Sequence, residues 1–392
     1  MDSSEDDYCS RPRVRNGFIG HYIPIPLNSS NYFNCCWTHT VFQNEDPSFH
    51  YSCAEKNIWG CLNMMESFAG ICLNLMVMLP LLSNVSLRKE YMTPSIFSIS
   101  TSDFFFSLIT IPKLCITLFI GDVPYLTGCQ LPALIGYGLW LTTGLNLLGM
   151  ATLRFFAVYF PLTTKSRKFK YACTLTPVFG WLLSFIILLP TLVGRYGQFG
   201  LECKSFRCQF ISINEHGEPL GFGPDKLFGF LIVFSGCLMV SFNIATLRVV
   251  TKKSGKLFKQ LGNSDSRCSG KCSKNDKIIK RIIAIVTASY VLVYLPVMIL
   301  HSIVPNAMIT HRWLTMICQF LACSLVVIDP LTFIVCHKKL RKEIHFFAKK
   351  SNTDVTKFIY RFLFIAGVNK NSNCKDKNVS LDEQTKTESI KT

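Results

Sequence analysis

The sequence predicts an all-α membrane protein, a seven-transmembrane helix bundle with its N-terminus outside the cell and an amphipathic helix after the seventh span. Hydrophobic residues make up 49% of the 392 residues and charged residues only 17%, whereas soluble domains carry roughly 25% charged residues. Seven apolar runs reach the length of about 18 residues that a helix needs to cross a bilayer. Basic residues concentrate between and after these runs, which is the pattern expected of membrane topology.

The apolar runs define the candidate spans. Charged side chains are rare within them, and only a helix satisfies its own backbone hydrogen bonds in lipid. We therefore expect each run to form one membrane-spanning helix. The seven ranges are 59–82, 95–120, 131–160, 172–194, 227–250, 278–302 and 313–336.

The distribution of basic residues orients the bundle. Residues 1–58 carry four Lys/Arg and seven Asp/Glu, whereas residues 251–281 carry ten Lys/Arg and the segment after Cys336 carries thirteen. Because basic residues favour the cytoplasmic side, the N-terminus is expected outside and the tail inside. The predicted organisation is an extracellular segment 1–58, a seven-span domain 59–348 and a cytoplasmic tail 349–392. The net charge of +17 thus reflects topology, and no nucleic-acid partner is expected.

The predicted outer segment carries two kinds of extracellular signal. Asn28 begins the sequence Asn-Ser-Ser, which is an N-glycosylation acceptor. Four cysteines share this compartment, where disulfides persist, and their pairing stays open at this stage. They are Cys9, Cys35, Cys36 and Cys53.

Polar residues in the first two spans stand out against their apolar surroundings. Asn74 lies in the first span, and Asp103 lies in the second among Phe, Ile and Leu. A lone carboxylate at this depth needs a cation, a proton or hydrogen-bond donors, and a neutral Asp bonded to neighbouring hydroxyls is the alternative. Pro112 can bend the same helix. Lys113 follows near the outer end, where it either lines a cavity or extends toward the membrane surface.

The third span contains one charged residue, Arg154, between Leu131 and Tyr159. An arginine within a membrane is costly unless it faces protein, water or the interface, so it is a candidate functional residue. An arginine that extends to the membrane surface from a span end is the alternative.

The residues around Arg154 resemble those of the rhodopsin-like (class A) family of G-protein-coupled receptors. A third span in that family opens with a cysteine and ends in an acid-Arg-Tyr motif followed by Ala-Val and Pro-Leu. Here Arg154 lies twenty-five residues after Cys129, as in the family, within LRFFAVYFPL. Leu153 stands in place of the acid and Phe155 in place of the tyrosine. Losing the acid removes the carboxylate that restrains the arginine in the inactive state.

The resemblance covers about residues 59–348. Trp181 and Pro190 are nine residues apart in the fourth span, and Pro296 matches the kink proline of the sixth. In the seventh span Asp329, Pro330 and Phe333 match the Asn-Pro-x-x-Tyr motif in position. The fifth span departs most, because Ser235 replaces a kink proline and Asn243 replaces a tyrosine, so a straighter helix is expected there. A weaker resemblance links the loop around Cys208 to Moody/Tre1-type orphan receptors of invertebrates and to melatonin receptors.

The resemblance implies two structural features at the ends of the bundle. A disulfide is expected from Cys129 to Cys208, with Cys203 as the other possible partner, and it would fix the lid of an outer cavity. At the inner end Asp276 falls where many family members place an acid that pairs with Arg154; a solvated Asp at a helix start is the alternative. The residues expected to carry G-protein coupling and switching are Arg154, Leu153, Asp276, Asn243, Pro296, Pro330 and Phe333.

The same resemblance brings Asp103 and Asp329 together at mid-membrane depth. Two carboxylates there do not both ionise cheaply without a cation. A bound sodium ion or a shared proton is therefore expected, with Asn74 and Thr143 as nearby oxygen donors. No other cofactor is expected.

Two positions disfavour two known ligand classes of the family. Gly136 stands where aminergic receptors carry an Asp, and Cys323 stands where opsins carry their lysine. The candidate cavity instead combines aromatic rings with one or two cations, which favours a small or lipid-like ligand bearing an acid, although helix packing alone also produces aromatic stripes. Its residues are Lys113, Gly136, Tyr137, Trp140, Tyr294 and His301.

The predicted function is that of a non-enzymatic plasma-membrane receptor. It would transmit the binding of an extracellular ligand to heterotrimeric G proteins, and the tail would serve arrestin and a receptor kinase. No nucleophile with a paired base is evident. The alternatives are an arrestin-only or scavenger-type receptor, favoured by Leu153, Asn243 and Phe333, and a cation-coupled transporter using Asp103 and Asp329.

Overall fold

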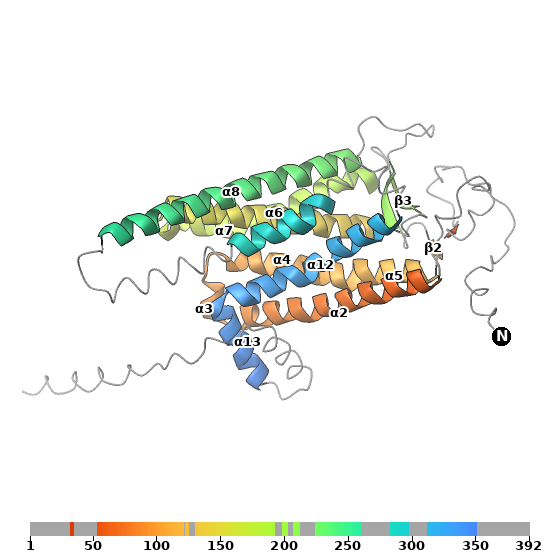
Figure 1. The fold of residues 1–392 in the computed structure, drawn as a ribbon, viewed down its shortest axis with the longest axis horizontal. Coiled ribbons are helices and arrows are strands. Elements are labelled where there is room, and N and C mark those ends of the chain that lie inside the picture. Colours follow the sequence, from red (N-terminus) through yellow and green to blue (C-terminus); the bar gives the residue numbers. More distant parts are fainter. Residues whose placement is uncertain are drawn as a thin grey trace, which may run out of the picture. The chain divides into compact units, whose positions relative to one another are not determined.

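The computed structural model describes residues 32–34, 53–120, 122–124, 130–192, 198–202, 207–211, 224–260, 283–297 and 312–350. The chain divides into two compact units, residues 1–340 and 341–392. Within the described part, helices form the membrane-spanning elements and short strands lie in the connections (Figure 1). The helices are α2 (Cys53–Ser83), α3 (Val85–Arg88), α4 (Thr93–Phe105), α5 (Ile111–Ile120), α6 (Leu131–Tyr159), α7 (Arg167–Leu192), α8 (Pro224–Gln260), α12 (Arg312–Cys336) and α13 (Lys338–Lys350).

Six described helical segments are long and apolar enough to span a membrane. The sixth predicted span is described from Ile283 to Val297 as a shorter apolar helix. The predicted bundle is therefore confirmed. The fourth span begins at Arg167, earlier than expected. Its first turns are basic, so a search for apolar runs does not include them. The six long segments are Ala54–Ser83, Thr93–Phe119, Leu131–Tyr159, Arg167–Thr191, Leu227–Lys252 and Met316–Cys336.

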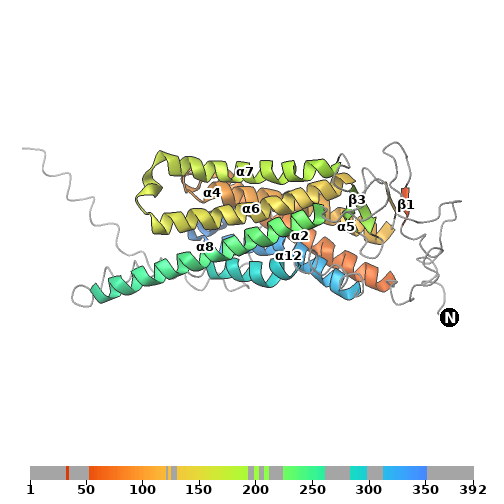
Figure 2. The ribbon, with the colours of Figure 1, turned by 90° about the horizontal axis from the view of Figure 1, so that it is seen from above.

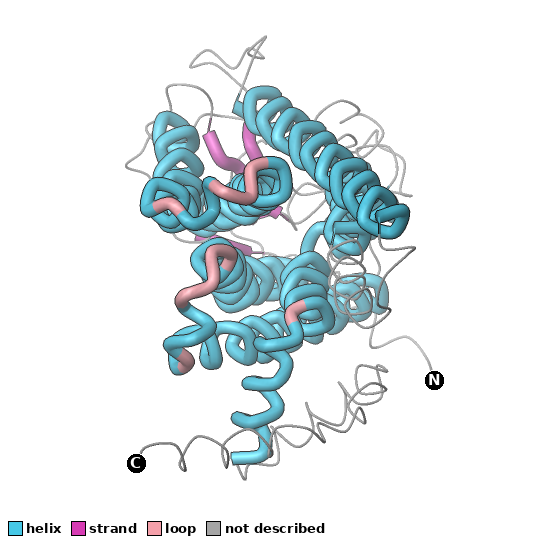
Figure 3. The backbone as a smooth tube through the Cα atoms, turned by 90° about the vertical axis from the view of Figure 1, so that its left-hand side faces the viewer, coloured by secondary structure: helices cyan, strands magenta, loops and turns pink. Residues whose placement is uncertain are grey.

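Helix α6 lies at the centre of the bundle. It packs against α4, α7 and α8, while α2 packs against α4, α5 and α12. Figure 2 shows α6 running beside α7 and α8, and in the end-on view of Figure 3 the helix axes run in broadly the same direction. Arg154 and the residues before it therefore face neighbours on several sides.

Two of the prolines noted in the sequence follow π-helical turns. The turn η3 (Phe106–Thr110) ends two residues before Pro112, and η7 (Tyr290–Tyr294) ends two residues before Pro296. Proline lacks the N–H of a helical hydrogen bond and its ring crowds the carbonyl four residues earlier. A wider π turn accommodates this, and such turns are frequent at functional sites.

Helix α8 is continuous over 37 residues, and Figure 2 shows it as one long, uninterrupted ribbon. No proline lies between Asp225 and Gln260, so the missing-donor cause of a kink is absent. On its inner face Gly236 lets Tyr290 approach, because a Cβ at Gly236 would overlap the Tyr290 ring. The Tyr290 hydroxyl donates to the Ile232 carbonyl over 3.0 Å.

Two antiparallel ladders lie in the outer connections. Strand β1 (Tyr32–Asn34) pairs with β2 (Asp122–Pro124), and β3 (Gln198–Glu202) pairs with β4 (Arg207–Ile211). In the second ladder Cys208 lies opposite Leu201, and β4 packs against α6 and α8. Cys208 is thus carried by a strand at the outer end of the third and fifth spans.

Candidate functional site

The mid-bundle centre, which we define as Asn74, Asp103, Thr143 and Asp329, is buried. These residues are 0%, 3%, 3% and 5% exposed. The Thr143 hydroxyl donates to Asp103 Oδ1 over 3.0 Å, which joins α6 to α4. The Asn74 amide donates to the Val326 carbonyl over 3.0 Å, which joins α2 to α12. Four helices thus bring polar groups to one level of the bundle.

Three acceptor oxygens of this centre have no hydrogen-bond partner among the described residues. They are Asn74 Oδ1, Asp103 Oδ2 and Asp329 Oδ2. The carboxylates of Asp103 and Asp329 are also near enough to repel each other. Oxygen donors of this kind, with unsatisfied lone pairs, fit a hard monovalent cation. The residues present therefore fit either of the two expectations, a bound sodium ion or a proton shared by the carboxylates.

Arg154, near the inner end of α6, is 8% exposed. Its Nη2 donates to Met150 Sδ over 3.2 Å, and a thioether is only a weak acceptor. Among the described residues Arg154 forms no ion pair, although Tyr91 and Cys336 lie within electrostatic range. Its guanidinium is thus held in place without a described carboxylate.

Leu153 takes part in an apolar contact instead of restraining Arg154 by charge. It forms a buried cluster with Phe169 and Cys173 at the start of α7, with Ala157 packed beside them. The Tyr91 ring lies 5.9 Å from that of Phe169, which ties the loop before α4 to this cluster. Burial raises the pKa of the Tyr91 hydroxyl, so Tyr91 stays neutral.

Asn243 contacts the sixth span. Its amide donates to Thr287 Oγ1 over 3.0 Å, while its Oδ1 is buried without a described partner. One residue earlier, the Phe242 ring lies 5.4 Å from that of Phe155. Phe333 of α12 is buried. The fifth span therefore holds the sixth through Asn243 and contacts the third through aromatic rings.

An aromatic cluster lies at the outer end of α6 and α8. The Tyr137 ring meets that of Phe228 edge-on at 5.1 Å, and the Trp140 ring lies 6.0 Å from Phe228. Trp140 also packs against Val297 and Cys318, which brings the sixth and seventh spans to the cluster. Phe228 is a residue that the sequence reasoning missed, because no periodic signal separates it from its apolar neighbours.

Two further residues of the predicted ligand cavity are described. Gly136 is buried against Thr110, whose Cγ2 would lie 2.9 Å from a Cβ at that position. Lys113 is half-buried on α5, and its carbonyl accepts from Thr117 Oγ1 over 3.0 Å. Gly136 therefore faces the second span, and Lys113 lies on the continuation of that span.

Several predicted site residues lie outside the described residues. Asn28, Cys129, Asp276 and His301 belong to ranges the structure does not describe, as do the side chains of Cys208 and Tyr294. The predicted disulfide, the Asp276–Arg154 pair and the glycosylation site therefore stay predictions.

Glu90 joins the loop before α4 to the junction after α12, a contact that the sequence reasoning missed. Its carboxylate meets His337 Nε2 at 2.9 Å and Lys339 Nζ at 2.6 Å. His337 Nδ1 accepts the Leu340 N–H over 3.2 Å, which places the ring proton on Nε2, facing Glu90. Burial lowers the pKa of His337, and Glu90 opposes that shift.

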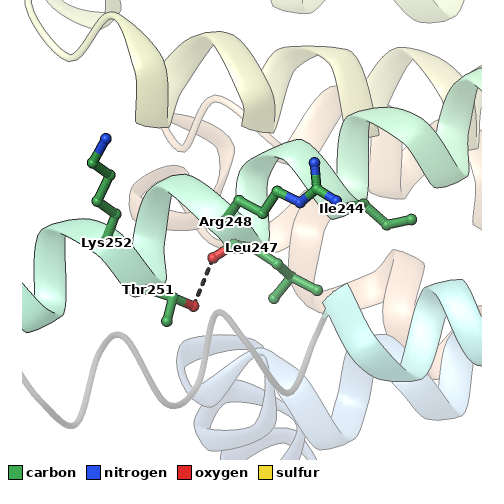
Figure 4. A pocket seen from close by; sticks show the side chains of 5 residues that line it. All are labelled: Ile244, Leu247, Arg248, Thr251 and Lys252. Atoms are coloured by element: carbon green, nitrogen blue, oxygen red, sulfur yellow. Dashed lines mark hydrogen bonds between the residues drawn. The ribbon is translucent and has the colours of Figure 1, made fainter.

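A groove follows the inner part of α8 (Figure 4). It has a volume of about 450 Å³ and is lined by apolar Ile244 and Leu247 and by basic Arg248 and Lys252. Thr251 completes the lining, and its hydroxyl donates to the Leu247 carbonyl over 2.7 Å. The groove combines an apolar floor with two cations at the cytoplasmic end of the fifth span.

The chain matches known proteins along most of its length. Residues 73–333 match the sequence profile described as 7 transmembrane receptor (rhodopsin family). Protein trapped in endoderm-1 of Drosophila melanogaster is 23% identical over 291 residues, which cover 69% of this chain and 72% of that protein. The crystal structure of squid rhodopsin superposes with a TM-score of 0.59 at 18% identity and covers 76% of this chain and 88% of that one. The last likeness is one of fold.

Proposed function

The chain belongs to the rhodopsin family of seven-transmembrane receptors, and from this premise we propose that it transmits the binding of an extracellular ligand to heterotrimeric G proteins at its cytoplasmic face. As a member of that family it is a non-enzymatic signalling receptor and a multi-pass protein of the plasma membrane. The observation that supports the proposal most directly is the environment of Arg154. Its guanidinium is buried, and among the described residues its hydrogen bond goes to the thioether of Met150. Such a group is available to a new acceptor once the inner end of the bundle opens.

The proposed switch is a shift between two arrangements of the sixth span. In the arrangement described here, Asn243 bonds Thr287 and Tyr290 bonds the Ile232 carbonyl. Movement of the helix about Pro296 would displace Thr287 more than Tyr290, because Thr287 lies farther from the proline on its cytoplasmic side. The Asn243–Thr287 contact would therefore break first. The carbonyls at the end of a G protein's terminal helix would then meet Arg154, and the groove on α8 would offer its apolar floor and two cations to that helix.

The proposed ligand is small or lipid-like and carries an acid. Lys113 supplies a cation on α5, and the cluster of Tyr137, Trp140 and Phe228 supplies aromatic surface on α6 and α8. An acid headgroup paired with the lysine and an apolar body on the rings would satisfy both features. A ligand that contacts Trp140 would also affect the packing of the sixth span, because Trp140 packs on Val297.

An arrestin-only receptor is the second candidate, and the apolar surroundings of Leu153 favour it. Leu153, which packs against α7, stands where the family has an acid. The movement that exposes Arg154 therefore need not be the one used by family members that carry the acid. The tail would then recruit arrestin and a receptor kinase without nucleotide exchange.

A cell assay distinguishes these functions. G-protein activation and arrestin recruitment are measured in parallel, with and without a panel of acidic lipids, for wild type, Arg154→Ala and Asp276→Ala at matched surface expression. The proposal predicts G-protein activation that Arg154→Ala abolishes and Asp276→Ala raises. Arrestin recruitment without exchange would support the second candidate, and an electrogenic flux that survives Arg154→Ala would support a transporter.

A further inference from the structure

The outer parts of α2, α5 and α12 meet along a seam whose polar groups the proposed switch does not use. We call this the outer seam and define it by Trp59, Asn63, Glu66 and Gln319. The three residues of α2 are spaced i, i+4 and i+7, so they share one face of the helix. Glu66 lies eight residues before Asn74, about 12 Å along the helix axis toward the outside. The seam is therefore separate from the mid-bundle centre.

Helix contacts place this face of α2 against α12. The Trp59 ring lies 6.2 Å from that of Phe320, and a Cβ at Gly70 would come within 2.7 Å of Val326 Cγ2. Glu66 lies between these two contacts along α2. Gln319 is the immediate neighbour of Phe320, so it lies near the level of Trp59, outward of Glu66.

The facing surface of α12 points into the same seam. Gln319, Cys323 and Val326 share one helical face by their i, i+4 and i+7 spacing. Cys323 and Val326 form a buried cluster with Ile111 and Cys115 of α5, and Cys115 lies within electrostatic range of Glu66. Glu66 and Gln319 are thereby brought to one three-helix junction.

The polar atoms of the outer seam are buried and unsatisfied. Trp59, Asn63, Glu66 and Gln319 are 8%, 2%, 8% and 7% exposed. Among the described residues, Asn63 Oδ1, Glu66 Oε2 and Gln319 Oε1 accept no hydrogen bond, and Trp59 Nε1 donates none. Glu66 also forms no ion pair with a described residue. A buried carboxylate without an ion pair requires a cationic donor to be stable in its charged form.

We propose that the outer seam binds the primary ammonium group of a small amine. An ammonium of this kind has three N–H donors, which match the three unsatisfied acceptors in number. The rings of Trp59, Trp313 and Phe320 lie close together in the outer part of the seam, with Trp59 5.9 Å from Trp313 and 6.2 Å from Phe320. Aromatic faces attract an organic cation and its alkyl chain. Binding here is independent of whether the receptor couples to a G protein.

A thermal-shift titration of the full-length receptor in lipid nanodiscs tests the site with defined probes. The probe is n-butylammonium chloride, compared with n-butyltrimethylammonium chloride and potassium chloride at the same ionic strength. We expect a saturable rise of the unfolding midpoint with n-butylammonium alone, because the trimethyl compound has the charge without the N–H donors. The absence of a saturable rise, or an equal rise with the trimethyl compound, would overturn the proposal.

Single substitutions test whether n-butylammonium binds at the outer seam. Glu66→Gln is expected to weaken n-butylammonium binding at least about thirtyfold, because the cation loses its buried countercharge. Gln319→Leu should weaken it by a smaller factor, and Glu55→Gln, the other acid of α2, should leave it unchanged. Without probe, Glu66→Gln should unfold at the wild-type midpoint or above, since it removes an unpaired buried carboxylate. Unchanged affinity in Glu66→Gln, or a lowered midpoint that marks a purely structural glutamate, would contradict the assignment.

Discussion

The His337 imidazole donates from Nε2 to the Glu90 carboxylate over 2.9 Å, and this contact links the loop before the second span to the end of the seventh. The Lys339 ammonium meets the same carboxylate at 2.6 Å. The contact lies beside the part of α12 that contains Phe333, whose carbonyl accepts the His337 N–H over 2.8 Å. Protonation of His337 would therefore change contacts at the inner end of the bundle.

The first prediction concerns pH. Burial lowers the pKa of His337 from 6.5, so near that pH the unfolded chain binds more protons than the folded chain, and stability falls as the pH drops below about 6.5. Between about pH 7.5 and 5.5 the unfolding midpoint of wild type should drop more than that of His337→Gln. Differential scanning fluorimetry in nanodiscs measures this. Equal slopes for His337→Gln and wild type would refute the prediction.

The second prediction concerns the restraint on Arg154. Leu153→Asp places a carboxylate beside the guanidinium, so we expect basal G-protein activation to fall about fivefold or more. Leu153→Asn is the matched control, because it disturbs the apolar cluster with Phe169 and Cys173 without adding charge. Basal activity is read from nucleotide exchange at equal surface expression. A similar fall in Leu153→Asn would assign the effect to lost packing.

A third prediction concerns sodium at the mid-bundle centre. Sodium chloride should raise the unfolding midpoint of wild type above its value in potassium chloride at the same concentration, since a ligand that binds only the folded state stabilises it. Asp103→Asn should remove the difference, because it replaces one of the two carboxylates. A sodium effect of equal size in Asp103→Asn would show that the ion binds elsewhere or acts through the lipid.

The fourth prediction concerns the contact between α8 and the sixth span. Gly236→Ala should destabilise the receptor by about 1–3 kcal/mol, because its Cβ overlaps the Tyr290 ring. Adding Tyr290→Leu should restore part of the loss. Gly180→Ala is a milder comparison, since its Cβ would lie 3.2 Å from Asn146 Nδ2. Chemical denaturation measures these variants and Tyr290→Leu alone, and a loss in the double variant equal to the sum of the two single losses would contradict a direct contact.

The span pattern could be predicted because its cause is local, whereas the grouping of Asp103 with Asp329, Asn74 and Thr143 was implied by the family resemblance alone. Apolar length determines the helices, and a buried Asp103 requires donors such as Thr143, which the structure places 3.0 Å away. The π turns before Pro112 and Pro296 were foreseeable only as bends, because proline disturbs a helix without specifying how the turn relaxes.

Contacts between distant surface segments were not foreseeable. Glu90 and Lys339 are 249 positions apart in the sequence, and neither differs in type from an ordinary solvated charge. Glu66 was overlooked for a related reason, because its neighbours Asn63 and Ser67 make that turn of α2 look polar rather than buried. Phe228 likewise has no signal of its own within a run of apolar residues.

The most direct test of the central claim is nucleotide exchange on purified heterotrimeric G proteins by the full-length receptor in nanodiscs, compared with Arg154→Ala at equal receptor concentration. The account predicts exchange above the receptor-free rate for wild type and a return to that rate for Arg154→Ala, with both receptors unfolding at similar midpoints. Equal exchange by the two receptors would contradict it, because Arg154 would then have no part in G-protein coupling.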